Sequence, residues 1–176
     1  MELNEAIDLI NTPQLKQERP QNWADLGCGS GLFTYALAQY LAPKSHIYAV
    51  DKHLVQFNKH FYPAGLHLQF LQADFTQIGL PLHNLDGILM ANALHYVKQQ
   101  ANFIEQLKSY LQPQGKLLIV EYDTNRANQW VPFPLPFSEL KSLLLEAGFI
   151  HVTKLRSRAS VFNNGTMYAA ISSLPT

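Results

Sequence analysis

The amino-acid sequence predicts an α/β fold in which a mostly parallel sheet of seven strands carries helices on both faces and ends in an antiparallel hairpin. Short apolar runs of strand length alternate with segments whose apolar residues recur at helical spacing. A glycine-rich turn follows the first strand-like run, as in a strand–turn–helix unit. The last two strand-like runs are joined through Asn163, Asn164 and Gly165, which is a hairpin signal.

Length and composition indicate one domain with a sizeable core. The chain has 176 residues, of which 47% are hydrophobic. We expect a single domain over 1–176, with an N-terminal helix and connector at 1–21 and the sheet at 22–176. The 13 basic and 13 acidic side chains cancel, which gives no electrostatic reason to expect a nucleic-acid partner. No apolar run is long enough to span a membrane and the N-terminus lacks the basic region of a signal peptide, so we expect a cytoplasmic protein.

Cysteine and histidine usage argues against a disulfide or a metal site. Cys28 is the single cysteine, so no internal disulfide can form. The seven histidines show no metal-ligand spacing such as His-x-x-x-His on a helix. We therefore predict no metal.

The elements follow from the spacing of apolar residues and from turn residues. Leu3, Ala6, Ile7 and Ile10 fall on one helical face, which predicts a helix over 3–10. Ser138 is placed to cap the last helix, which ends at Gly148. The predicted strands are 23–26, 46–51, 66–71, 86–91, 116–122, 149–155 and 166–172; the other helices begin at Leu32 and span 52–61 and 98–111, and a turn at Pro113–Gly115 precedes the fifth strand.

The glycine turn after the first strand is the best candidate for a ligand site. Gly27, Gly29 and Gly31 stand at alternate positions, where the backbone can take dihedrals that a Cβ forbids and a ligand can lie close to it. The dinucleotide fingerprint is G-x-G-x-x-G, whereas this turn is G-x-G-x-G. Asp25 before it would repel a diphosphate but suits an ammonium or sulfonium ligand. The pattern therefore disfavours a nicotinamide-dependent oxidoreductase. The remaining alternative is a turn that closes a βα unit without a cofactor.

Asp25, Gly27, Gly29 and Gly31 match the pattern acid-x-G-x-G-x-G position for position. The turn resembles motif I of the class I S-adenosylmethionine-dependent methyltransferases, and the resemblance extends over essentially the whole chain. It implies their Rossmann-like sheet, S-adenosylmethionine as cofactor and S-adenosylhomocysteine as product. It also implies that these four residues and Cys28 contact the cofactor, and that the N-terminal helix partly covers it.

Two further acids match the same family. Asp51 follows the second strand at the distance from the glycine turn where an acid accepts hydrogen bonds from ribose hydroxyls; the alternative is a helix N-cap. We place Lys52 beside it in the cofactor site. After the third strand, the resemblance implies that Asp74 bonds the adenine amino group and Phe75 covers the ring. An acid after a strand is also an ordinary turn residue.

The segment after the fourth strand resembles the family's fourth motif in its small-molecule branch. There the resemblance places Asn92 at the cofactor, and His95 is the best candidate for a general base, with a packed structural histidine as the alternative. Tyr96 can shape a substrate pocket or belong to the core. Glu121, at the end of the fifth strand, is a candidate substrate contact or a turn acid.

The connector at 123–137 is long for a compact domain, and such connectors are often functional. Trp130 and Phe133 lie in its aromatic and proline-rich part and are candidate substrate contacts on a lid. A proline-braced loop that covers the sheet is the alternative.

Two absent motifs disfavour the methylation of nucleic-acid bases. Asn92 is not followed by Pro-Pro-Tyr/Phe, the signature of enzymes that methylate exocyclic amino groups, and no Pro-Cys nucleophile is present.

The predicted function is methyl transfer to a small-molecule acceptor by in-line displacement, in which proximity and orientation supply much of the rate. A general base is needed only for a nucleophile that arrives protonated. The alternatives are a protein-directed methyltransferase and a non-catalytic, cofactor-binding subunit that stabilises another methyltransferase.

Overall fold

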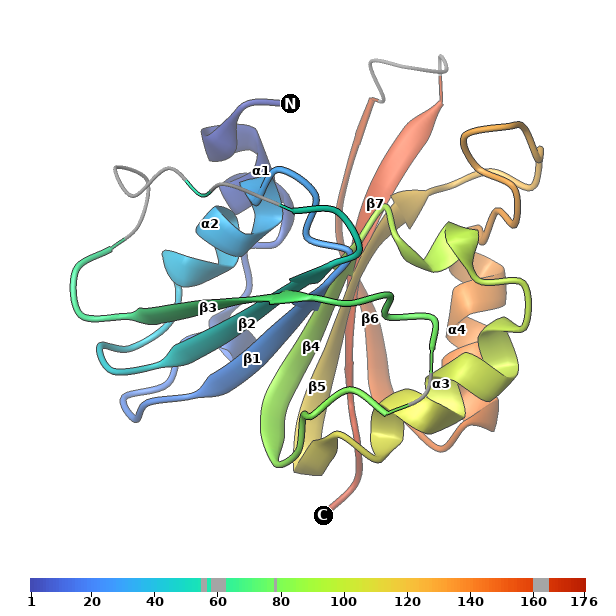
Figure 1. Ribbon diagram of the computed structural model, residues 1–176. Coiled ribbons are helices and arrows are strands. Elements are labelled where there is room, and N and C mark those ends of the chain that lie inside the picture. Colours follow the sequence, from blue (N-terminus) through green and yellow to red (C-terminus); the bar gives the residue numbers. More distant parts are fainter. Residues whose placement is uncertain (55–56, 58–62, 78, 160–164) are drawn as a thin grey trace.

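A computed structural model describes residues 1–54, 57, 63–77, 79–159 and 165–176. These residues form a seven-stranded sheet in the order β3-β2-β1-β4-β5-β7-β6, with β7 antiparallel to both β5 and β6 and the other neighbours parallel (Figure 1). The predicted fold class is confirmed. The strands are β1 (Asn22–Leu26), β2 (His46–Asp51), β3 (His67–Gln72), β4 (Leu85–Ala91), β5 (Leu111–Tyr122), β6 (Ile150–Ala159) and β7 (Thr166–Ser173).

Helices cover both faces of the sheet, as predicted. α1 and α2 pack on one face, and α3 and α4 lie on the other (Figure 1). Each face of the sheet has its own apolar core. Every residue of α2 from Phe33 to Ala38 is buried, either in or beside the core on the face that α1 and α2 cover. The helices are α1 (Leu3–Leu9), α2 (Leu32–Ala38), α3 (Gln100–Lys108) and α4 (Phe137–Glu146), with 3-10 turns η1 (Pro13–Leu15) and η3 (Leu94–Tyr96). No helix in the described part of the chain is long and apolar enough to cross a membrane.

The strand order opens a crevice at β1. Chain connections leave β1 toward β2 on one side, whereas β4 pairs with β1 on the other side. In open α/β sheets, the carboxyl ends of strands at such a switch point form the ligand-binding crevice. Trp23 and Gly87 fix this pairing: the two residues are opposite each other, and an added Cβ at Gly87 would overlap the fully buried Trp23 ring.

Several element boundaries differ from the predictions. β5 begins at Leu111, so the turn predicted at Pro113–Gly115 is part of an irregular strand, and the register to β4 shifts between Leu85 and Gly87. Ser138 does not cap α4, because the helix begins one residue before it; the Phe137 amide donates instead to Asp123 Oδ1 at 3.0 Å. The helix predicted over 52–61 and the turn at 163–165 lie largely outside the described residues.

Candidate active site

A cavity of about 760 Å³ lies at the carboxyl ends of β1, β2 and β4. That volume is within the range of small-molecule and cofactor sites. It brings together nine of the ten predicted cofactor residues: Asp25, Gly27, Cys28, Gly29, Asp51, Lys52, Asp74, Phe75 and Asn92. Seven further residues line the cavity without having been predicted, and most of them are direct chain neighbours of predicted residues: Ser30, Leu32, Phe33, His53, Thr76, Ala91 and Ala93.

The tenth residue, Gly31, is not among those that line the cavity. Gly31 caps α2 with a φ of 85°, and an added Cβ would overlap the Phe57 ring. Helix geometry and packing therefore require a glycine at this position. Gly27 likewise has a φ of 79°, and a Cβ there would come within 2.8 Å of Ala93 Cβ. Gly29 is different, because a Cβ there would meet no atom within 4 Å.

Asp25 is a buried carboxyl group with one unpaired oxygen. Its side chain is 1% exposed, and the Thr34 hydroxyl donates to Oδ2 at 2.6 Å. Among the described residues no donor reaches Oδ1. Burial raises the pKa of Asp25 to about 7; the Thr34 hydrogen bond opposes this rise and the nearby Asp51 charge adds to it. A cation that enters the cavity would meet this acceptor and favour its ionised form.

Asp51 links the glycine turn to the end of β2. The Gly29 amide donates to Oδ2 and the His53 amide to Oδ1, both at 2.9 Å. Two amide donors hold the carboxylate in place, and its remaining lone pairs can still accept hydrogen bonds from a ligand.

Asp74 and Phe75 form the wall next to β3. Asp74 Oδ1 accepts hydrogen bonds from the Thr76 hydroxyl at 2.6 Å and amide at 2.9 Å, and these two bonds lower the pKa of Asp74. The Phe75 ring packs edge-on against Phe103, with centroids 6.0 Å apart, and reaches within 3.0 Å of the point where a Gly27 Cβ would stand. Phe75 thus lines the cavity next to the glycine turn.

The hydrogen-bond acceptors and the charges of the cavity fit a cationic ligand. Three carboxyl groups line it against one lysine, Lys52. Asn92 Oδ1 is a second buried oxygen without a donor among the described residues, and it also lines the cavity. Unpaired buried acceptors call for a ligand that carries hydrogen-bond donors. S-adenosylmethionine, with its ammonium and sulfonium charges, fits this set of residues, whereas a dinucleotide diphosphate does not.

Cys28 lies in the same turn but is not a nucleophile. Burial, together with the nearby Asp25 and Asp51 charges, raises the pKa of its thiol well above the ordinary range. The thiolate is the reactive form, so this cysteine stays inert. No group of three or more histidine, cysteine or acidic residues suited to a metal ion is found among the described residues.

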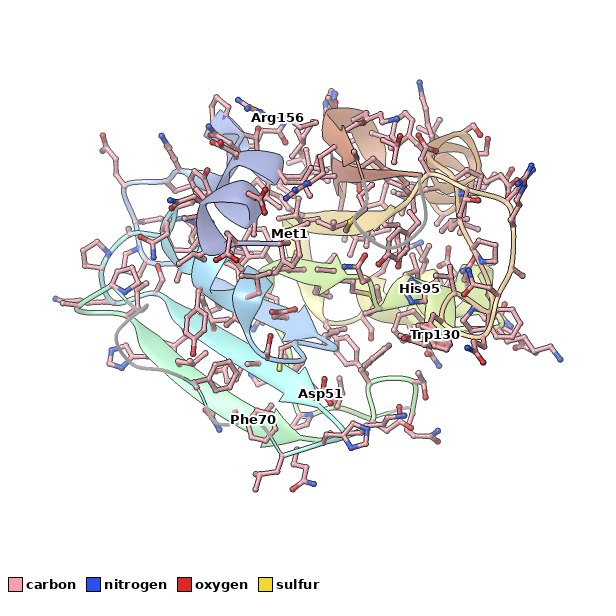
Figure 2. The ribbon with its side chains drawn as sticks, turned by 90° about the horizontal axis from the view of Figure 1, so that it is seen from above. Met1, Asp51, Phe70, His95, Trp130 and Arg156 are labelled. Atoms are coloured by element: carbon pink, nitrogen blue, oxygen red, sulfur yellow. The ribbon has the colours of Figure 1, made fainter. Side chains whose placement is uncertain are left out.

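A second cavity of about 590 Å³ adjoins the first and shares Asn92 and Tyr96 with it. Figure 2 shows two of its residues, His95 and Trp130, close to each other at this end of the sheet and apart from Asp51. Three of the predicted substrate or catalytic residues therefore line one pocket. The full lining is Asn92, His95, Tyr96, Tyr122, Asn128, Gln129, Trp130 and Val131.

His95 and Glu121 form a buried pair beneath this pocket. His95 Nδ1 lies 2.7 Å from Glu121 Oε2, and the His95 amide donates to Oε1 at 3.1 Å. Both side chains are at most 2% exposed. Because the carboxylate accepts both bonds, we assign the ring proton to Nδ1, which leaves Nε2 as the basic nitrogen. No hydrogen bond to Nε2 is found among the described residues.

Two of the predicted substrate contacts, Glu121 and Phe133, are not among the residues that line this pocket. Glu121 is fully buried and both its oxygens bond to His95, so it orients the histidine and does not face the pocket. Phe133 is not among the pocket residues; its amide donates to the His95 carbonyl at 3.0 Å, and its own carbonyl accepts from Gln100 at 2.9 Å. The connector is therefore anchored at His95, and its buried Val131 contributes to the pocket wall.

The N-terminal helix does not cover the cavity. α1 packs against α2, and its Glu5 forms a 2.7 Å ion pair with Arg158 of β6. None of the residues that line the first cavity belongs to α1. α1 therefore contributes nothing to the lining of this cavity, in contrast to the covering role that the resemblance implies.

Comparisons with solved structures show the same fold. The chain aligns with the CurJ carbon methyltransferase (18% identity, TM-score 0.66), covering 94% of this chain but only half of that one. It aligns with the Burkholderia thailandensis 1,6-didemethyltoxoflavin-N1-methyltransferase, solved with 1,6-didemethyltoxoflavin and S-adenosylhomocysteine (16% identity, TM-score 0.69, 99% of this chain and 78% of that chain). The magnesium protoporphyrin IX methyltransferase of Synechocystis PCC 6803, solved with S-adenosylmethionine, gives 16% identity and a TM-score of 0.63 over 98% of this chain and 77% of that chain.

Sequence comparison identifies the family. A comparison with curated proteins gives no significant match. The family profile of a methyltransferase domain, however, matches residues 24–119, which is more than half of the chain and runs from β1 into β5. The chain belongs to this methyltransferase-domain family, whose enzymes use S-adenosylmethionine.

Proposed function

We propose that this chain binds S-adenosylmethionine in the larger cavity and transfers its methyl group to a small molecule in the adjoining pocket. The observation that carries the proposal is the junction of the two cavities at Asn92 and Tyr96. One cavity holds an unpaired buried carboxyl oxygen, on Asp25, and the other holds a buried His95–Glu121 pair. A donor and an acceptor bound in these cavities would be in contact.

Three carboxyl groups have distinct tasks in cofactor binding. Asp25 accepts a hydrogen bond from the ammonium group of the methionine part, Asp51 accepts from the ribose hydroxyls, and Asp74 accepts from the adenine amino group. S-adenosylmethionine supplies a methyl group on a sulfonium, which departs as S-adenosylhomocysteine with the electron pair of the broken S–C bond. The chain's own contribution is to hold the acceptor in line and exclude water.

His95 acts as a general base for an acceptor that arrives protonated. Its Nε2 takes the proton while Glu121 holds the ring and stabilises the imidazolium that forms. The presence of a pocket here favours an enzyme over a non-catalytic subunit, for which a flat apolar patch would suffice. A pocket of about 590 Å³ matches a small molecule. The Burkholderia and Synechocystis neighbours are also methyltransferases named after small molecules.

The acceptor class can be tested with S-adenosylmethionine that is labelled in its methyl group. The protein is incubated with the two fractions of a cell extract, the low-molecular-mass filtrate and the desalted protein. We expect label in the filtrate, and labelling that is slower by about 10²-fold or more when the His95→Ala variant replaces the protein. Label in the protein fraction alone would establish a protein-directed enzyme, and no transfer to either fraction would favour the non-catalytic subunit.

Gly29→Ala is expected to weaken S-adenosylmethionine binding about tenfold or more, because the added methyl group takes up cavity space where the ligand lies close to the backbone. Gly148→Ala is the matched control. It also places a Cβ at positive φ with no atom within 4 Å, but at the end of α4 away from the cavity. Calorimetric titration should show weakened binding for Gly29→Ala alone, with similar small losses of stability in both variants. Equal affinities would place the ligand elsewhere.

A further inference from the structure

We infer that the acceptor is an uncharged, planar aromatic molecule. Its phenolic hydroxyl group receives the methyl group while His95 takes up the hydroxyl proton. The inference rests on the proposed function and narrows it to one substrate class. Three features of the smaller pocket carry it: its aromatic walls, its lack of charged side chains, and the buried base at its floor.

The walls of the pocket offer aromatic faces. Tyr96, Tyr122 and Trp130 all line it, and the Tyr96 ring lies 4.3 Å from the His95 ring, centroid to centroid. Trp130 is 60% exposed and Tyr96 is 54% exposed, so large parts of both rings are free of protein contacts. Flat aromatic ligands stack on such faces, and burial of the two exposed rings against a ligand would add apolar contact.

The pocket has no charge to offer a charged acceptor. Among the described residues that line it there is no lysine, arginine, aspartate or glutamate. Burial raises the pKa of Tyr122, so its hydroxyl stays neutral. The Glu121 carboxylate is buried, and both its oxygens bond to His95. An ammonium or carboxylate group on the ligand would lose hydration here without a compensating partner.

The base selects a weakly acidic hydroxyl group. A ring nitrogen or amine with a free lone pair needs no base before it attacks, so the His95–Glu121 pair would be idle for such acceptors. A phenol has a pKa of about 10, within reach of an imidazole, which has an ordinary value of about 6.5. An aliphatic hydroxyl, close to the value of about 15.7 for water, is far less acidic.

The step balances in atoms and charge. The hydroxyl proton passes to His95 Nε2, the oxygen forms a bond to the methyl carbon, and the S–C bond breaks with its electron pair going to sulfur. The products are a neutral aryl methyl ether, neutral S-adenosylhomocysteine and a proton on His95, which leaves to solvent after product release.

The test uses four probes of one shape: 2-naphthol, naphthalene, 2-naphthoate and 2-naphthylmethylammonium. Binding is measured by calorimetry and by tryptophan fluorescence, with and without S-adenosylhomocysteine. We expect 2-naphthol to bind about tenfold or more tightly than either charged probe. With S-adenosylmethionine it should yield 2-methoxynaphthalene. Tighter binding of a charged probe, or no binding of 2-naphthol, would overturn the inference.

Trp130→Ala locates the bound probe. We expect this variant to bind 2-naphthol about tenfold more weakly while its affinity for S-adenosylhomocysteine is unchanged. Leu145→Ala removes another exposed apolar side chain, 49% exposed on α4 outside the pocket, and should bind 2-naphthol like the parent. Unchanged 2-naphthol binding in Trp130→Ala would remove the pocket as its site.

The two proposals fail in different ways. If S-adenosylhomocysteine does not bind, the proposed function fails. The binding of the four probes without cofactor still shows whether the pocket prefers the uncharged hydroxyl compound. If S-adenosylhomocysteine binds but 2-naphthol does not, only the acceptor class is wrong.

Discussion

Replacing Asp25 by asparagine is expected to weaken S-adenosylmethionine binding about tenfold or more and to stabilise the cofactor-free protein at pH 8. In the parent protein the Thr34 hydroxyl donates to Asp25 Oδ2 at 2.6 Å, and the asparagine side chain keeps an oxygen that can accept this bond. It removes the negative charge that the buried site disfavours, and with it the acceptor for a ligand ammonium group.

The sign of the pH dependence follows from the raised pKa of Asp25. Its value is about 7 in the folded protein against an ordinary 3.8. Below the ordinary value the group is protonated in both states and contributes nothing. As pH rises, the unfolded chain releases its proton first, so the free energy of unfolding falls until about pH 7 and stays low above it.

Differential scanning calorimetry at pH 4 and pH 8 checks this. Asp25→Asn should raise the melting temperature at pH 8 by about 4 °C or more, which corresponds to 1–2 kcal/mol for a chain of this size, and change it little at pH 4. The exposed Asp8→Asn on α1 is the control and should do neither. An Asp25→Asn protein that binds S-adenosylmethionine like the parent would contradict the role of this carboxyl group.

Glu121→Gln is expected to lower kcat by about 10²- to 10⁴-fold, the range for loss of general-base catalysis, while affinity for S-adenosylmethionine is unchanged. The substitution preserves volume, but its amide no longer provides two acceptor oxygens for the His95 ring and backbone. The ring loses its fixed tautomer, and the imidazolium loses its counter-charge.

The matched variants separate catalysis from folding. His95→Ala should lose a similar factor, and the double variant little more than either, because the two residues act as one unit. His83→Ala, at an exposed position before β4, should keep the parent kcat. A Glu121→Gln enzyme with parent kcat would make the pair a structural feature only; a parallel loss of cofactor affinity and melting temperature would mean the same.

Local sequence signals were sufficient for the cofactor cavity. A strand, a glycine turn and a helix are adjacent in the chain, and acids at the ends of parallel strands meet at one sheet edge because the strands are in register. Asp25, Asp51 and Asp74 could therefore be placed together from sequence. For Gly31 the sequence could not separate two reasons for a glycine, because helix geometry and a ligand both favour one; the packing against Phe57 shows that the fold itself requires glycine there.

The second pocket depended on contacts between distant elements. His95 and Glu121 are 26 positions apart, and their pairing depends on how η3 lies across the end of β5. Both were singled out, but as separate candidates. The anchoring of Phe133 by its backbone has no sequence signal, since any residue carries an amide. Ser138 failed as a cap for the same reason: Asp123, distant in sequence, supplied the oxygen.

Calorimetric titration of the purified protein with S-adenosylmethionine and S-adenosylhomocysteine, with NAD as the control, tests the central claim most directly. We expect both sulfur compounds to bind, with one site per chain, and NAD to give no heat of binding. Binding of NAD, or of none of the three, would contradict the assignment of the acidic cavity to S-adenosylmethionine.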